Sequence, residues 1–362
     1  MPISILDNHK KIKKYDRSRV LETIEDFSLQ AQQAWREVKK IKIPKNYRKA
    51  EKIVINGMGG SGLSGHIIRE LFKEDLRVPL FVMNSYSLPW YLDRHTLYLA
   101  SSYSGSTEEP LSTLKTAAWR KAKIMGITTG SKLASFLKRN KQYPGYIINQ
   151  KFNYCKQPRL GLPYSLVGHL GLLRKAGFLK ISEQEMKQVF ELLPKLNTKW
   201  SGRIKQKNNL AKQIASSLQN KIPIIVASQF LLGNAHVMTN QINENSKNFA
   251  NYFAIPELNH HLLEGLSFPK TLRSQLYFIF IESSLYPPRI LARYRVTQHI
   301  LDKKKIKYVR VKAQSQEKLE QVFEILTLGS YFSFYLAVLN KVDPSLIPFV
   351  DLFKERLANF KN

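Results

Sequence analysis

Apolar residues in the first half of the chain switch repeatedly between the spacing of strands and that of helices. Short apolar runs bounded by turn residues predict five strands, at Lys52–Asn56, Pro79–Asn84, Thr96–Ser102, Lys123–Thr128 and Gly145–Asn149. Helical spacing follows several of them, at Ser61–Phe72, Thr107–Lys121 and Lys132–Lys138, and also precedes them at Val20–Val38. This βα alternation predicts a parallel sheet with helices on both faces.

The same alternation returns in the last third of the chain. Two helices are expected before this alternation, at Ser165–Lys175 and Ser182–Leu193, and prolines lie near their limits. Strands are then expected at Ile222–Ser228, near Tyr252–Ile255, at Leu276–Ile281 and at Lys307–Lys312, with helices at Leu231–Lys247, Ile290–Lys303, Glu317–Leu339 and Ser345–Asn359. We therefore predict an α/β protein with two doubly wound, flavodoxin-like domains, at 1–155 and 221–362, joined by a helical connection at 156–220.

The composition bears on the size of the core, on the cellular compartment and on membrane association. The chain has 362 residues, of which 43% are hydrophobic, enough to bury a sizeable core. Its one cysteine, Cys155, cannot form an intramolecular disulfide, and the N-terminus lacks a signal-peptide pattern, so we expect a cytoplasmic protein. The most apolar stretches, such as Tyr331–Leu339, are shorter than the ~20 residues that cross a bilayer, and no membrane association is expected.

The net charge of +30 has two interpretations, a nucleic-acid surface or a chain that is basic throughout. The basic clusters are scattered, at Lys10–Lys14, Lys39–Lys42, Arg120–Lys123 and Lys303–Lys307, and no nucleic-acid-binding motif accompanies them. We therefore expect solvated basic faces and no nucleic-acid partner. The positive field would still attract small anions such as phosphates.

A glycine loop, Gly57–Gly62, follows the first predicted strand and opens a helix. It satisfies G-x-G-x-x-G, but the next strand ends in Asn84-Ser85 and offers no acid for a ribose hydroxyl, which argues against a dinucleotide. No Gly-Lys-Ser/Thr ends the loop, so it is not a Walker A motif. A tight strand-to-helix turn that needs positive φ remains an alternative.

A hydroxyl loop, Ser102–Thr107, follows the strand Thr96–Ser102 and precedes Glu108-Glu109 at a helix start. Small hydroxyl side chains and the free N–H groups of a first helical turn can hold a phosphate monoester. Part of the run resembles a capping box. Two such loops at the carboxyl edge of one sheet nevertheless predict a phosphate site there.

The two loops together resemble the sugar-isomerase (SIS) domain. Four later segments resemble the bifunctional phosphoglucose/phosphomannose isomerases in particular. These are Gln157-Pro158-Arg159 with Gly161 and Tyr164–Leu166, Asn243–Lys247, Pro256–His260, and Tyr335–Ala337 with Asp343-Pro344 and Lys354. The sequence differs from the usual family motifs at Ser106 and within Thr128–Leu133. It also differs at His261, a position where the family often has Asn.

The resemblance implies two SIS domains in a homodimer, with the active site at the subunit interface. It places the sugar phosphate on Gly59, Gly60, Ser61, Ser102, Ser104 and Thr107. It assigns Glu244 as the catalytic base, His260 of the neighbouring subunit as the ring-opening group, and Arg159 and Lys354 as basic catalytic residues. His261 stands beside His260, which leaves open which of the two opens the ring.

The function expected is aldose–ketose isomerisation of glucose 6-phosphate, and of mannose 6-phosphate, to fructose 6-phosphate through a cis-enediolate. One carboxylate can move the proton between C1 and C2. The eight histidines form no His-x-His or His-Glu-x-x-His cluster, so neither a metal nor another cofactor is expected. Two alternatives remain open: a non-catalytic SIS sensor of sugar phosphates, and an SIS isomerase acting on an amino-sugar phosphate.

Overall fold

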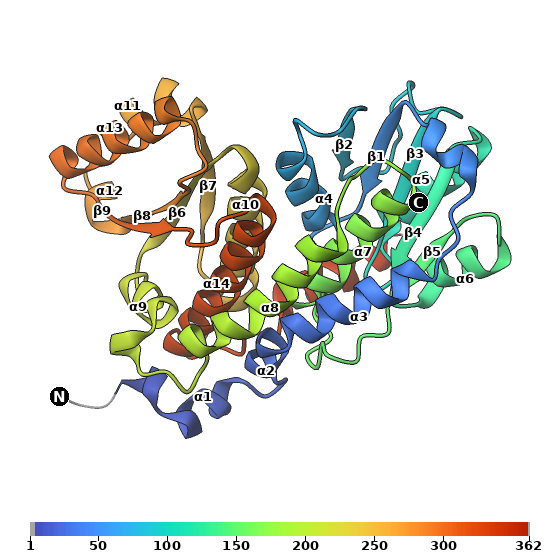
Figure 1. Ribbon diagram of the computed structural model, residues 1–362. Coiled ribbons are helices and arrows are strands. Elements are labelled where there is room, and N and C mark those ends of the chain that lie inside the picture. The colour runs from blue at the N-terminus through green and yellow to red at the C-terminus, as the bar shows by residue number, and fades with distance from the viewer. Residues whose placement is uncertain (1–3, 361–362) are drawn as a thin grey trace.

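The computed structural model describes residues 4–360, so the outer predicted domain limits, residues 1 and 362, lie outside the described part. The chain forms two parallel sheets with helices between and around them (Figure 1). Both sheets are parallel throughout. The α/β fold class predicted from the sequence is confirmed.

The N-terminal sheet has the strand order β2-β1-β3-β4-β5. Its strands are β1 (Lys52–Asn56), β2 (Leu80–Met83), β3 (Thr96–Ser101), β4 (Lys123–Thr128) and β5 (Gly145–Ile147). Alternate side chains pack on opposite faces, Ile53 and Ile55 into one apolar cluster and Val54 into another. The order reverses between β1 and β3, which is where doubly wound sheets bind ligands.

The C-terminal sheet repeats this plan with one strand fewer. Its order is β7-β6-β8-β9, with β6 (Ile222–Ser228), β7 (Asn251–Ile255), β8 (Leu276–Glu282) and β9 (Lys307–Lys312). Its order reverses between β6 and β8.

Helices make up most of the remaining structure. The α-helices are α1 (His9–Tyr15), α2 (Val20–Glu25), α3 (Phe27–Lys39), α4 (Gly60–Leu71), α5 (Glu108–Trp119), α6 (Ser131–Arg139), α7 (Leu162–Lys175), α8 (Glu183–Trp200), α9 (Leu210–Ser217), α10 (Leu232–Ser246), α11 (Leu262–Gly265), α12 (Leu272–Gln275), α13 (Pro288–Lys304), α14 (Lys318–Leu339) and α15 (Pro348–Ala358). Short 3₁₀ turns are η1 (Ile5–Asp7), η2 (Lys45–Lys49), η3 (Pro158–Leu160), η4 (Gln206–Asn208), η5 (Gln229–Leu231) and η6 (Glu257–His260).

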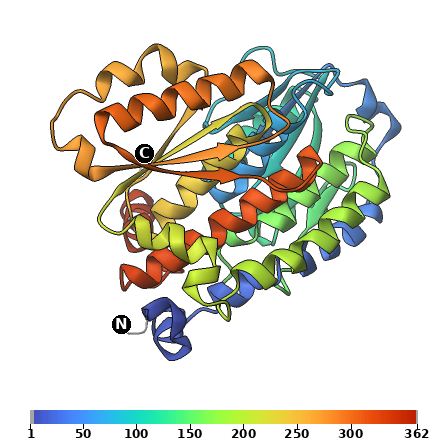
Figure 2. The ribbon, with the colours of Figure 1, turned by 60° about the vertical axis from the view of Figure 1, so that its left-hand side comes forward.

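Two helices form the centre of the molecule. α7 is buried along nearly its whole length, and Gly168 lets it approach Tyr146 of the N-terminal sheet. α14 contacts α8, α9 and α10, and Figure 2 shows it between the C-terminal sheet and α8. Within residues 4–360, α14 is the one helix long and apolar enough to cross a membrane, and 94% of its apolar window is buried inside the protein.

The two sheet domains meet where α4 packs on α10. A Cβ at Gly233 would lie 2.5 Å from the Ile67 Cα, so only glycine allows the two helices to come this close. One turn away, the rings of His66 and His236 contact edge to face, with centroids 4.4 Å apart. α4 begins at the glycine loop and α10 ends next to Glu244. The junction of the two helices therefore fixes the distance between the glycine loop and Glu244.

Four predicted helices were wrong in their limits. The helix predicted at Ser165–Lys175 already begins at Leu162, with Pro163 in its first turn, where proline's missing N–H has no helical partner to lose. The helix predicted at Val20–Val38 is two helices, divided at Asp26, whose carboxylate accepts a hydrogen bond from Tyr154 Oη at 2.5 Å. α8 continues past Pro194, although proline cannot donate the helical hydrogen bond to Phe190 O; Ser28 Oγ of α3 donates to that carbonyl at 3.0 Å instead. The last helix begins at Pro348 rather than at residue 345.

Candidate active site

The glycine loop and the hydroxyl loop lie side by side at the carboxyl edge of the N-terminal sheet, because β1 and β3 are neighbouring parallel strands. They flank the point where the strand order reverses. Gly59 caps α4 with φ +48°, and the Ser61 hydroxyl accepts a hydrogen bond from the Tyr103 amide at 2.8 Å. The Ser61 carbonyl accepts one from Ser101 Oγ at 2.8 Å, so the two loops are directly joined.

Ser102 organises the hydroxyl loop from inside. Its buried Oγ accepts from the Gly105 amide at 3.0 Å and donates to Thr107 Oγ1 at 2.8 Å. Ser104 is exposed, and Ser106 Oγ lies 3.1 Å from Ser104 Oγ. The loop therefore presents Ser104, Ser106 and Thr107 around the start of α5, where helical N–H groups face outward.

Gly60 brings the glycine loop against the segment that carries Arg159. A Cβ at Gly60 would lie 2.8 Å from Arg159 N and 2.9 Å from the Pro158 carbonyl carbon. The proposed phosphate loops and Arg159 thus belong to one continuous site.

The Arg159 guanidinium is completely buried and uses all of its N–H donors inside the protein. Nη1 donates to Glu244 Oε2 at 3.0 Å and to Gln157 Oε1 at 2.9 Å, and Nε donates to Asn245 Oδ1 at 2.6 Å. Nη2 donates to the carbonyls of Pro344 at 2.7 Å and Ser345 at 2.9 Å. Burial lowers the pKa of Arg159, and the Glu244 carboxylate opposes that shift.

Glu244 lies in the last turn of α10, and its side chain is 28% exposed. Its neighbour Asn245 is buried and donates to Ser333 Oγ of α14 at 3.0 Å. Gln241, one turn earlier, donates to the Arg159 carbonyl at 3.1 Å and to Ser330 Oγ at 2.9 Å. The helix end is therefore fixed to both Arg159 and α14, while the Glu244 carboxylate keeps access to solvent.

His260, His261 and Lys354 lie apart from this cluster. All three are exposed, His260 in η6, His261 just after it, and Lys354 in α15. Across residues 4–360, no hydrogen bond or ion pair joins any of them to Glu244 or Arg159. One chain brings together the glycine loop, the hydroxyl loop, Arg159 and Glu244, and leaves the other predicted residues at the surface.

Lys247 caps α10 in the left-handed conformation, with φ +53°. Its Nζ donates to Asn245 O at 3.2 Å and to Asp343 O. Desolvation and the Arg159 charge lower the pKa of Lys247 to about 8, against the attraction of Asp343 and Glu244. Its position in the motif Asn243–Lys247 was visible in the sequence, but nothing there assigned it a role.

Backbone carbonyls are the part of the site that sequence reasoning missed. Pro344 and Ser345 hold Arg159 through main-chain oxygens, which leave no residue-type signal. Asp343-Pro344 formed part of the family resemblance, but only the structure brings it to Arg159.

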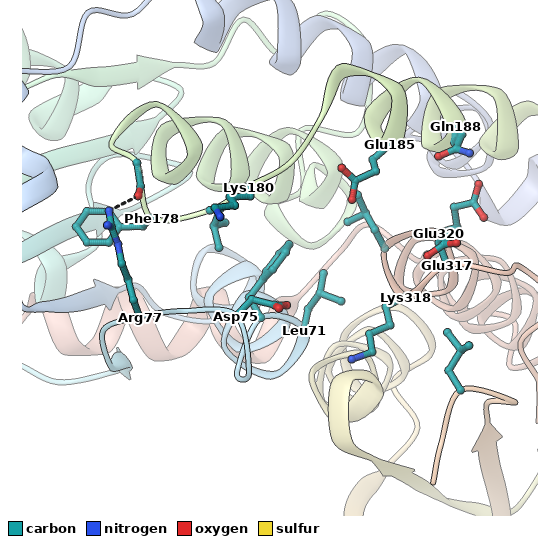
Figure 3. A pocket seen from close by; sticks show the side chains of 15 residues that line it. Leu71, Asp75, Arg77, Phe178, Lys180, Glu185, Gln188, Glu317, Lys318 and Glu320 are labelled. Atoms are coloured by element: carbon teal, nitrogen blue, oxygen red, sulfur yellow. Dashed lines mark hydrogen bonds between the residues drawn. The ribbon is translucent and has the colours of Figure 1, made fainter.

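Two large grooves in the surface lie apart from Glu244 and Arg159. One, of about 740 Å³, is lined by Arg77, Lys180, Glu185 and Lys318, among others, between α4, α8 and α14 (Figure 3). Another, of about 990 Å³, lies between α5 and α6 and is lined in part by Ser106 and Lys132, next to the hydroxyl loop. Neither is lined by Glu244 or Arg159. In the described residues, no three His, Cys, Asp or Glu side chains gather in a way that could hold a metal ion.

Comparison with known proteins agrees with the fold. Residues 207–357 match the model of the bacterial phospho-glucose isomerase C-terminal SIS domain. A hypothetical protein from Thermus thermophilus superposes with a TM-score of 0.74 at 17% identity, over 97% of this chain and 93% of that one. The C-terminal domain of glucosamine-fructose-6-phosphate aminotransferase from Francisella tularensis gives 0.68 at 14% identity, over 91% and 98%. The fold is that of SIS-domain proteins, and the family model that matches residues 207–357 describes a SIS domain of a phospho-glucose isomerase.

Sequence relatives identify the family. The bifunctional phosphoglucose/phosphomannose isomerase of Caldicellulosiruptor bescii is 30% identical over 95% of this chain and 100% of its own length. The enzyme of the same name from Thermoplasma acidophilum is also 30% identical, over 84% and 89%. This chain belongs to the bifunctional phosphoglucose/phosphomannose isomerase family, as the sequence resemblance predicted. D-Glucosamine-6-phosphate 4-epimerase of Sulfolobus acidocaldarius is 31% identical over 59% of this chain and 64% of its own length.

Proposed function

We propose that the protein interconverts glucose 6-phosphate and mannose 6-phosphate with fructose 6-phosphate, without a metal, through a cis-enediolate. The observation that carries the proposal is the ion pair between buried Arg159 and the part-exposed Glu244, in contact through Gly60 with the two phosphate loops. A sugar phosphate held on those loops extends toward the carboxylate.

The loops would bind the phosphate with neutral donors. Gly59, Gly60 and Ser61 supply the start of α4, and Ser104 and Thr107 supply hydroxyls at the start of α5. Buried Ser102 holds the loop in shape through its own hydrogen bonds. Two helix N-termini directed at one site favour a dianion.

Glu244 would act as the base. Its carboxylate takes the proton from C2 of the aldose, the C–H electron pair forms the C1=C2 bond, and the carbonyl oxygen becomes the enediolate oxygen. The same carboxyl group then returns the proton to C1 while the hydroxyl proton on O2 passes to the O1 oxyanion. The C1=C2 bond opens, C2=O forms, and the product is the ketose. No oxidant or other reactant is needed.

Arg159 supports this step through charge. While Glu244 is ionised, the two charges compensate each other at 3.0 Å. When Glu244 accepts the proton, the negative charge moves to the enediolate and the guanidinium loses its counterion. A fixed positive charge in a buried site then stabilises the intermediate without reorganisation.

The site would be completed in a homodimer. His260 and Lys354 are exposed in one chain and separate from Glu244, and every residue of α15 is exposed. We place ring opening on His260 and a supporting basic role on Lys354 once two copies assemble.

The test is fructose 6-phosphate formation from each aldose in EDTA, with wild type compared to Glu244→Gln. We expect activity that survives the chelator and falls about 10²–10⁴-fold in the variant, because the general base is lost. Glu191→Gln, an exposed carboxylate on α8, is the matched control and should keep wild-type activity. Folded wild type without activity on either sugar contradicts the proposal.

An amino-sugar phosphate is the second candidate substrate, because a glucosamine-6-phosphate epimerase is among the relatives. Glucosamine 6-phosphate should compete only weakly with glucose 6-phosphate if the neutral sugars are the substrates. Turnover of glucosamine 6-phosphate faster than of either neutral sugar would favour this second function.

A further inference from the structure

The turn between α14 and α15 is held to the candidate active site from several sides. Besides the two Arg159 bonds, Gln157 Nε2 donates to Ser345 Oγ at 3.4 Å, and Asn340 Nδ2 donates to Ser246 O at 3.0 Å. Lys247 Nζ adds a bond from a charged donor to the Asp343 carbonyl. This turn, residues 343–345, therefore supplies two of the five acceptors that orient Arg159.

We propose that Lys247 is a positioning residue for the base Glu244. Its ammonium fixes the turn 343–345 to the C-terminus of α10. The next two carbonyls of that turn hold Nη2 of Arg159, and Nη1 of the same guanidinium meets Glu244. The inference rests on the proposed isomerase function. It adds a residue that acts on the reaction without touching the substrate.

The position of Lys247 suits this role. The left-handed cap turns the chain back toward Asp343, and the side chain bonds Asn245 O on its own helix end at the same time. The charged groups that face it in the described chain are Arg159 from η3, Glu244 from α10 and Asp343 from the turn after α14. A pKa of about 8 means that Lys247 loses its charge at mildly alkaline pH and then bonds the carbonyl more weakly.

The first experiment compares Lys247→Met with Lys305→Met. Lys305 is the matched control, because it caps α13 in the same left-handed conformation, with φ +57°, away from the site. We expect kcat to fall about tenfold to hundredfold in Lys247→Met with little change in KM, as for the loss of one charged hydrogen bond. Hydrogen exchange of the amides in 340–347 should accelerate in Lys247→Met alone.

The second experiment follows the alkaline limb of the kcat–pH profile. Wild-type kcat should fall above about pH 8, and Lys247→Arg should move that fall to higher pH, because guanidinium keeps its proton. Lys247→Cys modified with bromoethylamine carries a thioether ammonium of lower pKa and should move it to lower pH. Cys155, the only cysteine in the sequence, is buried, so treated wild type is the control.

Two results overturn the role of Lys247 in an active enzyme. One is a kcat–pH profile whose alkaline limb lies at the same pH in wild type, in Lys247→Arg and in the modified Lys247→Cys variant. The other is a Lys247→Met variant whose kcat and exchange at 340–347 match those of Lys305→Met. Wild type with no isomerase activity would instead overturn the proposed function, and this role with it.

Discussion

The chemistry of the site depends on the geometry of a single guanidinium. Arg159 is buried, and five acceptors surround it, three from side chains and two from the backbone. Only the fork of arginine can meet acceptors on so many sides in one plane. Because one of those acceptors is the proposed base, the orientation of Glu244 follows from the orientation of Arg159.

Arg159→Lys should therefore be strongly disruptive although it conserves charge. An ammonium offers three donors, so at least two of the five acceptors lose their partner, and we expect the free energy of unfolding to fall by about 2–4 kcal/mol. Isomerase activity should fall with it, because Glu244 is no longer held. Chemical denaturation and kcat measure the two effects.

Arg310→Lys is the control for that substitution. Arg310 also forms a forked pair with a buried carboxylate, Glu282, but it donates only to the two oxygens of that one group, and the three donors of a lysine ammonium can still meet them. We expect a much smaller change there. Equal destabilisation in both variants would contradict the importance assigned to the buried acceptors of Arg159.

At the scale of elements, the local sequence pattern predicts the limits of a strand or helix correctly where those limits depend only on residues in or next to that segment. β1, β4, β6 and β9 have the limits expected from the sequence, because their buried apolar residues and flanking turns are local. The helix through Pro194 could not be foreseen, since the donor that replaces the missing one comes from Ser28, far away in the chain.

In the candidate site too, some residues can be located from local sequence and others cannot. Gly59, Ser61 and Ser102 lie at the ends of strands, and a motif at a strand end can be located from sequence. The carbonyls of Pro344 and Ser345 reach Arg159 only through the packing of α14 on α10, which no local spacing encodes.

The junction between α4 and α10 gives stability a pH dependence. Burial and the neighbouring His236 lower the pKa of His66 to about 3, below its ordinary value of 6.5. The unfolded chain therefore binds this proton more readily, so the stabilisation is complete above about pH 6.5 and is lost as the pH falls toward 3. Buried His169, with its pKa lowered to about 4, contributes in the same direction.

His66→Gln should make the fall in stability between pH 6.5 and 4 less steep, because one proton fewer is taken up on unfolding. Urea denaturation at several pH values measures the slope. His299→Gln, an exposed residue on α13, should leave the slope unchanged. A slope in His66→Gln that equals that of wild type would show that the α4–α10 junction is not the source.

At the scale of the whole molecule, the net charge opposes the association of two copies, whereas exposed apolar side chains favour it. A net charge of +30 makes two copies repel at low salt. α15 nevertheless exposes large apolar side chains, with Phe349 82% exposed, Phe353 64% and Phe360, just beyond its end, 78%. Phe349 and Phe353 lie one turn apart on the same face of α15, and an exposed apolar face of this kind is typical of an association surface. In the proposed homodimer, a second copy of the chain covers α15 and brings His260 and Lys354, the residues proposed for ring opening and for a basic role, to the site.

Phe349→Ser combined with Phe353→Ser should therefore convert a dimer to a monomer and abolish most of the isomerase activity. Sedimentation velocity measures the first effect and kcat the second. The proposed dimer should tighten as salt rises from low concentration, because screening weakens the repulsion between the two basic chains while apolar contacts persist. Trp119→Ser, which removes an aromatic side chain that is 80% exposed on α5, should leave both association and activity unchanged. A wild type that sediments as a monomer with full activity would exclude a site shared between subunits, and ring opening would then have to come from within one chain.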